Sequence, residues 1–374
     1  MGPNSIPIHV LKIANGFFSN TLCDIINLSF KSGIFPNLCK LAKVIPIFKK
    51  DNPLLCENYR PISILPIYSK IFEKVIYKRM YDYLDANNLL YSRQFGFRAK
   101  HSTTHALIST TEDIKLNIDS GNYVGGIFID LQKAFDTVNH EILCEKLYNY
   151  GFRGSAQLLI KSFLTNREQF VSINGYDSEK LEIKCGVPQG STLGPLLFTL
   201  YINDLRLSLK QTTASHFADD TCISFASKKT KTLESVLNYE LKLTCEWLRA
   251  NRLSLNVGKS KLLIFKSKQR KLDNDNISIK LNGIKLVPSE HVKYLGVYLD
   301  NNLSWSTHVT QLSKKLSRAN GVLSKLRYFV PKETLISVYY SIFYSHIIYA
   351  NPVWSLTTQK ILILLPRYKK RVFE

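Results

Sequence analysis

The stretch Phe217-Ala218-Asp219-Asp220 decides the fold of this chain. Residues 214–218 are fairly apolar and free of Gly and Pro, and residues 221–225 alternate in polarity. This pattern predicts a strand, a two-residue turn at the aspartates and a second strand. Two adjacent carboxylates repel each other, and a pair of divalent cations about 3.5–4 Å apart would compensate for them. The alternative is that Asp-Asp is ordinary turn chemistry on a solvated loop.

A second acidic position favours the metal interpretation. Ile127-Phe128-Ile129 is an apolar run that ends at Asp130. A buried strand that ends in an acid directs the carboxylate out of the end of the sheet, onto a rigid support. Carboxylate oxygens suit Mg²⁺, which takes the rest of its ligands from water and substrate phosphates. Two acidic strand ends far apart in sequence therefore predict one shared metal centre.

Composition points to a polyanionic partner. The 374 residues include 50 Lys and Arg against 29 Asp and Glu, a formal charge of +21. Such an excess destabilises a compact state by self-repulsion, and nucleic acid would relieve it. The alternatives are a basic soluble protein or one bound to acidic membranes. Apolar runs such as residues 361–365 fall far short of the ~20 residues that a span needs, and the N-terminus carries no signal peptide or lipidation motif. We expect an intracellular protein without a membrane span.

Cysteine and histidine spacing gives no structural metal site. The seven cysteines are scattered and contain no C-x-x-C pair, which argues against a disulfide framework and a zinc site. His101 and His105 are four residues apart, but Ser102 stands where a metalloprotease would have glutamate. We interpret them as surface or template-facing residues.

Local patterns predict several further elements. Residues 10–31 have a helical apolar face that ends at Gly33, and residues 40–50 read as a strand flanked by cations. That strand is either a protected sheet edge or a place where cations meet phosphate. Residues 186–191 form a loop that leads into a helix with apolar residues from Leu193 to Tyr201.

Nine short motifs, taken in order, resemble the reverse transcriptase of non-LTR (LINE-type) retrotransposons, close to jockey-like elements. They are NYRPIS at 58–63, QFGFR at 94–98, HST at 101–103, DLQKAFDTV at 130–138, GVPQGS at 186–191, LGPLLF at 193–198, FADD at 217–220, LNVGKS at 255–260 and YLGV at 294–297. Each is weak alone, and together they are very specific. The resemblance is tight from about residue 40 to 300 and looser to the end.

The resemblance implies an α+β right-hand polymerase fold with fingers, an antiparallel palm sheet and a helical thumb. The expected domains are an N-terminal helical extension at 1–39, the first part of the fingers at 40–125, a palm at 126–300 and a thumb-like region at 301–374. A fingers segment at about 140–184 would lie within the palm.

The resemblance also assigns catalytic roles. Asp130, Asp219 and Asp220 would hold two Mg²⁺ ions, with Mn²⁺ as the alternative. Lys259 would neutralise or protonate the departing pyrophosphate, which as general acid catalysis is worth about 10²–10⁴-fold. The alternative for Lys259 is a snorkelling surface lysine, and Lys261 lies two residues away.

Nucleotide contacts are expected at five positions. Arg60 and Arg98 would bind the triphosphate, because a guanidinium makes planar, bidentate contacts with phosphate. Gln189 and Gly190 would lie beside the template base and the incoming nucleotide. Phe135 would exclude a ribose 2′-hydroxyl; the alternative is that it is a core aromatic.

Beyond residue 300 the pattern becomes helical. Val309 to Leu326 carries one apolar stripe with basic residues on the other faces, and residues 330–349 read as a second helix packed on the first. Such a thumb would lay its cations along a duplex backbone. Five residues are expected to contact nucleic acid: Lys314, Lys315, Arg318, Tyr294 and Gly296.

The implied function is RNA-directed DNA polymerase, with RNA template, DNA primer and deoxynucleoside triphosphates as partners. An endonuclease domain, absent from this chain, is expected upstream in a longer reading frame, and the protein is expected in the cytoplasm and nucleus as a retroelement ribonucleoprotein. The alternatives are a degenerate, inactive retroelement fragment that only binds nucleic acid, and an RNA-dependent RNA polymerase, which shares the acid geometry.

Overall fold

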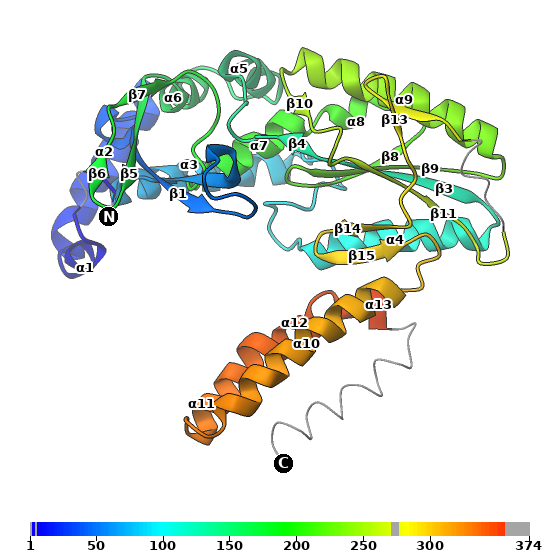
Figure 1. The fold of residues 1–374 in the computed structure, drawn as a ribbon. Helices are drawn as coiled ribbons and strands as arrows, with labels where there is room; N and C mark the ends of the chain where they lie inside the picture. The colour runs from blue at the N-terminus through cyan, green and yellow to red at the C-terminus, as the bar shows by residue number, and fades with distance from the viewer. Residues whose placement is uncertain (1, 4–5, 271–276, 356–374) are drawn as a thin grey trace. The chain divides into compact units, whose positions relative to one another are not determined.

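The computed structural model describes residues 2–3, 6–270 and 277–355 (Figure 1). The chain forms two compact units, each assembled from three separate segments. Unit 1 comprises Met1–Phe97, Leu131–Ser208 and Glu246–Leu255, and unit 2 comprises Arg98–Asp130, Leu209–Cys245 and Asn256–Glu374. Each unit has its own hydrophobic core. No helix among the described residues is long and apolar enough to cross a bilayer.

Unit 1 is mainly helical. Its α-helices are α1 (Ile8–Ile13), α2 (Asn15–Ser32), α3 (Ile67–Ala86), α5 (His140–Asn149), α6 (Ser155–Leu164), α7 (Gly194–Ile202) and α8 (Leu205–Ser208). The helix predicted for residues 10–31 is confirmed as α1 and α2, and α2 ends at Gly33, which has a φ of 69°. The helix predicted after the loop at residues 186–191, which we call the Gly-Pro loop, is confirmed as α7. Because α7 is apolar on nearly all sides, it is buried throughout rather than on one face.

A five-stranded sheet completes unit 1. Its order is β2-β1-β5-β6, with β7 also paired to β5. The strands are β1 (Leu41–Phe48), β2 (Tyr59–Ile64), β5 (Arg167–Ile173), β6 (Tyr176–Asp177) and β7 (Leu181–Ile183). The strand predicted at residues 40–50 is confirmed, but it is central, so the sheet-edge alternative was wrong. Pro46 is tolerated because β1 pairs with β5 only as far as Val44.

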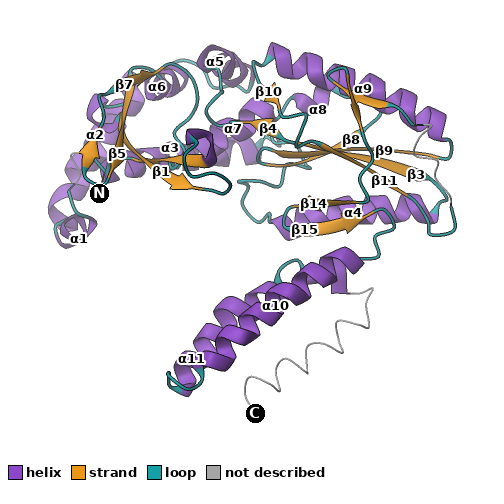
Figure 2. Cartoon of the chain, in the orientation of Figure 1, coloured by secondary structure: helices purple, strands orange, loops and turns teal. Residues whose placement is uncertain are grey.

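Unit 2 is built on a four-stranded antiparallel sheet in the order β11-β3-β9-β8, as the α+β prediction required. The strands are β3 (Tyr123–Ile129), β8 (Thr213–Phe217), β9 (Asp220–Ser227) and β11 (Lys261–Phe265). Helix α4 (Thr103–Asp119) packs on one side and α9 (Thr230–Ala250) on the other (Figure 2). Gly125 in β3 leaves room for the side chains of Leu233 and Leu237 from α9.

The rest of unit 2 contains two hairpins and a helical region. The hairpins are β12 (Ile279–Leu281) with β13 (Ile284–Leu286), and β14 (His291–Tyr294) with β15 (Val297–Asp300). The helices are α10 (Ser306–Leu326), α11 (Lys332–Tyr339), α12 (Ser345–Ile348) and α13 (Asn351–Trp354). The predicted apolar stripe of α10 is confirmed, since Leu312, Leu316 and Leu323 are buried. The predicted second helix packs on α10 (Figure 1), but a π-helical turn at Tyr340–Tyr344 interrupts it.

Two short strands of unit 1, β4 (Leu131–Gln132) and β10 (Ser254–Leu255), pair with each other, and the segment after β4 is tied to the Gly-Pro loop. The N–H of Gly186 donates to the carbonyl of Val138, and the N–H of Val187 donates to that of Phe135, both at 2.8 Å. Gly186 has a φ of 87°, and a Cβ there would lie 2.7 Å from the carbonyl oxygen of Asp136. Only glycine allows so close an approach.

We therefore expect Gly186→Ala to lower the free energy of unfolding by about 2–5 kcal/mol, from left-handed backbone strain plus the clash. Gly175→Ala is the matched control, because Gly175 has a φ of 89° but nothing within 4 Å of its Cβ position. That variant should lose only about 1–2 kcal/mol from backbone strain. Urea denaturation measures both, and equal losses would refute the role of the close approach.

Candidate active site

The hairpin that carries the aspartate pair is confirmed, with its turn one residue earlier than predicted. Phe217 pairs with Asp220, so Ala218 and Asp219 form the turn and Asp220 begins β9. Ala218 has a φ of 56°, a conformation that alanine adopts at a cost of about 1–2 kcal/mol. The structure therefore holds this turn in place against local backbone preference.

His216, a buried residue that was not predicted from the sequence, stabilises the hairpin next to its turn. Nδ1 of His216 lies 2.9 Å from Oγ1 of Thr221, directly across from it in the register. Burial lowers the pKa of His216 to about 4, so its ring is neutral at physiological pH. A neutral ring can hold the hydrogen bond without placing a cation in the core.

Asp130 lies beside this hairpin because of strand pairing. Ile129, the last residue of β3, pairs with Thr221 of β9. Because the strands are antiparallel, the next residue, Asp130, lies opposite Asp220. The N–H of Asp130 donates to Oγ of Ser260 at 3.2 Å, and its carbonyl accepts from the N–H of Asn256 at 2.9 Å. Two neighbouring strands and the 256–260 turn thus fix its backbone.

A cavity of about 250 Å³ lies beside Asp130 and Asp220, and Asp219 is not among the residues that line it. Asp130, Asp220 and Lys259 line it together, as do Lys261, Lys293 and Tyr294. Lys259 lies in a turn in which its N–H donates to Oδ1 of Asn256 at 3.3 Å. Lys293 was not predicted from the sequence, because only the fold places its position on β14 beside the aspartates.

The pKa of Asp220 reflects its burial and the negative charge that is concentrated at this site. Although Asp220 keeps one side open to solvent, surrounding protein desolvates its carboxyl group and raises its pKa to about 6. That value includes the smaller contributions of the negative charges of Asp219 and Asp130, which also raise the pKa of Asp220. Asp219 therefore lies within electrostatic range of the same centre.

Among the residues that the structure describes, no group of three His, Cys, Asp or Glu side chains stands ready to hold a metal ion. The carboxylates nevertheless suit a hard cation, because Mg²⁺ needs only one or two of them when phosphates and water supply the other ligands. A cation would also relieve the repulsion that raises the pKa of Asp220.

Tyr294 and Gly296 lie in the β14–β15 hairpin of unit 2. The Tyr294 ring is buried, 5.1 Å from that of Phe128, and burial raises its pKa well above the usual value. Gly296 is exposed in the turn with a φ of 83°. Arg98 is half-buried, while Lys314, Lys315 and Arg318 are exposed on α10.

The remaining predicted contacts belong to unit 1. Gln189 donates from Nε2 to Oδ1 of Asp136 at 2.9 Å, and its carbonyl accepts from the N–H of Ser63 at 2.7 Å. Gly190 has a φ of 123°, and a Cβ there would lie 2.5 Å from the carbonyl oxygen of Ser63. Ser63 and the exposed Arg60 both belong to β2, so the loop is joined to the strand that carries this arginine.

Phe135 has a packing environment as well as a place in the motif. Its ring is half-buried and stacks on Phe198 at 4.6 Å, and it meets Phe97 edge-on at 5.9 Å. Both interpretations of Phe135 in the sequence analysis therefore stay open to test.

Glu73 is a buried residue that the sequence analysis missed. Its two carboxylate oxygens accept hydrogen bonds from Oγ of Ser69 at 3.0 Å, the N–H of Thr192 at 2.6 Å and the N–H of Leu193 at 3.1 Å. The buried cation of Arg167 interacts with it electrostatically. Glu73 thereby anchors the end of the 186–191 loop where α7 begins.

Comparison with known proteins identifies the family. The family model "Reverse transcriptase (RNA-dependent DNA polymerase)" matches residues 47–299. The chain therefore belongs to the reverse transcriptase family, and the resemblance found in the motifs is confirmed.

Two curated relatives come from Drosophila melanogaster. The RNA-directed DNA polymerase from mobile element jockey is 30% identical over 93% of this chain, and the probable RNA-directed DNA polymerase from transposon X-element is 32% identical over 75%. The aligned regions cover 39% and 31% of those relatives. Apo telomerase from Candida tropicalis shares the fold, with a TM-score of 0.50 and 11% identity over 76% of this chain and 52% of that structure.

We expect Glu73→Ala to lower the free energy of unfolding by about 3–5 kcal/mol, because it leaves the buried Arg167 and the N–H groups of Thr192 and Leu193 without their carboxylate. Glu73→Gln keeps one acceptor oxygen and should lose about 1–3 kcal/mol. Lys78→Ala on the same helix is the control, since its ion pair with Asp82 is exposed and contributes under about 1 kcal/mol. Thermal or urea denaturation would refute the anchor if Glu73→Ala matched the Lys78 variant.

Proposed function

We propose that this chain is the RNA-directed DNA polymerase of a non-LTR retrotransposon. The observation that carries the proposal is the placement of Asp130 at the level of Asp220, with Lys259 lining the same cavity, in a member of the reverse transcriptase family. The proposed partners are an RNA template, a DNA primer and deoxynucleoside triphosphates. In the cell we place the chain in a ribonucleoprotein of the cytoplasm and nucleus.

Asp130, Asp219 and Asp220 are the proposed metal ligands. When bound, two Mg²⁺ ions would activate the primer 3′-hydroxyl and stabilise the charge of the leaving pyrophosphate, and Mn²⁺ could serve in their place. The three carboxylates lie where β3 ends and at the turn between β8 and β9. Strand pairing fixes the backbone beside them. Their mutual repulsion favours cation binding at neutral pH.

Other residues position the reactants. The Lys259 ammonium would neutralise the departing pyrophosphate or protonate it. Arg60 and Arg98 would bind the triphosphate, and Gln189, held by Asp136, would face the base pair that forms. The exposed cations of α10 would contact phosphates without regard to sequence.

Asp219→Asn tests the catalytic assignment. The variant should lose primer extension on an RNA template by about a thousandfold or more, because several kcal/mol of metal-dependent stabilisation disappear. Filter binding should show nearly unchanged affinity for the template. Asp119→Asn, an exposed change at the end of α4, is the control and should keep full activity. Retained synthesis in Asp219→Asn would refute the site, and a wild-type chain that binds but never extends would support the inactive alternative.

Phe135→Val tests the sugar gate. A smaller side chain would admit a ribose 2′-hydroxyl, so ribonucleotide incorporation should rise sharply while deoxynucleotide use falls only modestly. Single-nucleotide extension with each type of triphosphate measures both. Phe198→Leu removes the stacked ring from the buried side and serves as the control. Parallel loss of both activities in the two variants would make Phe135 a packing residue.

A further inference from the structure

The connection between α10 and α11 exposes two adjacent aromatic rings. Tyr328 is 71% exposed and Phe329 is 83% exposed. Large aromatic side chains gain much from burial, so two neighbouring rings left in solvent indicate a surface that meets a partner. We call residues 325–332 the α10–α11 tip.

Backbone hydrogen bonds hold this tip in an ordered turn. The N–H groups of Phe329 and Val330 donate to the carbonyl of Leu326 at 2.9 and 3.1 Å, and the N–H of Arg327 donates to that of Leu323 at 3.1 Å. Leu326 and Val330 pack against the core of unit 2. The rings are therefore presented by a pre-organised turn, which lowers the entropy lost on binding.

The tip is strongly basic. The Arg327 guanidinium lies 4.7 Å from the centre of the Tyr328 ring and donates from Nη2 to its hydroxyl at 2.5 Å. Lys325 and Lys332 flank the rings and are exposed. Between residues 314 and 332 every charged side chain is a cation. The chemistry of the tip is therefore aromatic faces beside positive charge, which suits bases joined by phosphates.

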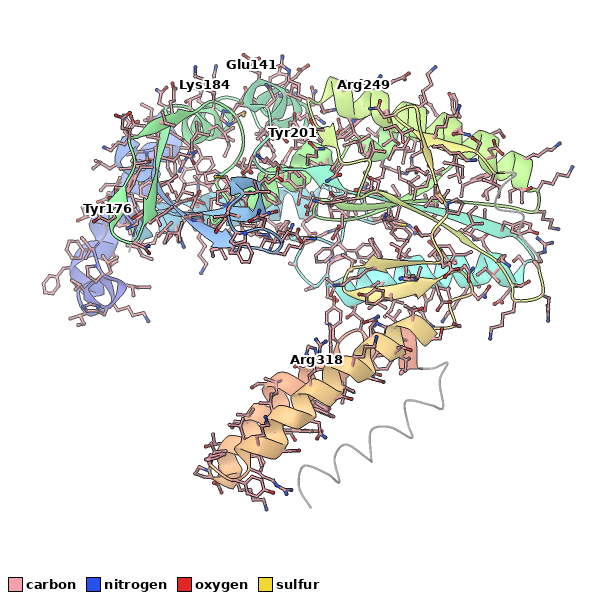
Figure 3. The ribbon with its side chains drawn as sticks, viewed as in Figure 1. Glu141, Tyr176, Lys184, Tyr201, Arg249 and Arg318 are labelled. Carbon is pink, nitrogen blue, oxygen red and sulfur yellow. The ribbon has the colours of Figure 1, made fainter. Side chains whose placement is uncertain are left out.

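A row of cations on α10 leads to the tip. Lys314, Arg318 and Lys325 are separated by four and seven residues, which places them on one face of the helix, and all three are exposed (Figure 3 labels Arg318). At 1.5 Å per residue they extend over about 16 Å. A linear row of this kind follows a phosphate backbone better than the flat surface of an anionic bilayer.

We propose that the α10–α11 tip binds an unpaired nucleic-acid strand by stacking bases on Tyr328 and Phe329, with the α10 cations holding its backbone. The faces of paired bases are covered within a duplex, so exposed rings discriminate in favour of unpaired ones. This inference rests on the proposed function, because it assumes that the polyanionic partner is nucleic acid.

Fluorescence anisotropy with a labelled oligo(dT) strand and a blunt duplex tests it, without divalent metal or nucleotide. The double variant Tyr328→Ala/Phe329→Ala should bind the single strand at least about tenfold more weakly, since base stacking contributes about 1–3 kcal/mol per ring. Its affinity for the duplex should stay unchanged. The ring swap Tyr328→Phe/Phe329→Tyr should restore single-strand binding.

Two controls separate the rings from charge and from general exposure. Tyr176→Ala removes a ring that is 83% exposed in unit 1 (Figure 3), and should leave both affinities unchanged. Arg318→Ala should weaken binding to both the single strand and the duplex. It should also reduce the slope of log affinity against log salt concentration by about one, the value for one lost phosphate contact.

Equal single-strand affinity of the alanine variant and the wild type would overturn the proposal, as would equal loss on strand and duplex. Ring-dependent binding to phosphatidylserine vesicles without an effect on strands would overturn it in favour of a membrane. Since the assay needs no turnover, failure of primer extension would refute the proposed function and leave this binding difference intact.

Discussion

The antiparallel pairing of β3 with β9 is the constraint on which the candidate site depends. Because Ile129 pairs with Thr221, the residues that follow and precede them, Asp130 and Asp220, meet at one end of the sheet. A slip of one residue would turn one carboxylate to the other face. The raised pKa of Asp220 follows from its desolvation and from the like charges that this register brings together. Strand register thus sets the electrostatics of the site.

Buried glutamates tie loops to the framework in both units. In unit 2, Glu240 of α9 accepts hydrogen bonds from the N–H groups of Lys210 and Gln211 and from Oγ1 of Thr212, just before β8 begins. In unit 1, Glu73 of α3 binds the end of the Gly-Pro loop in the same way. A buried carboxylate with several donors fixes a loop that has little apolar surface of its own.

The elements with strong local patterns could be predicted from the sequence. The hairpin at the aspartates, the strand that ends at Asp130, helix α7 and the apolar stripe of α10 each follow from periodicity that short windows contain. The exact turn was missed by one residue, because Ala218 adopts a conformation that alanine disfavours and only packing enforces. The π-helical turn and the central position of β1 likewise depend on neighbours distant in sequence.

By itself the sequence determined the family, the α+β class and the identity of the acidic strand ends, because motif order, periodicity and charge are properties of the linear chain. Only the tertiary structure decided which groups share a cavity, and it added Lys293, His216 and Glu73 to the residues of interest. It also decided that each of the two units is assembled from three separate segments of the chain. The physical reason is that hydrogen bonding, burial and electrostatic coupling act through space, between residues that no local pattern connects.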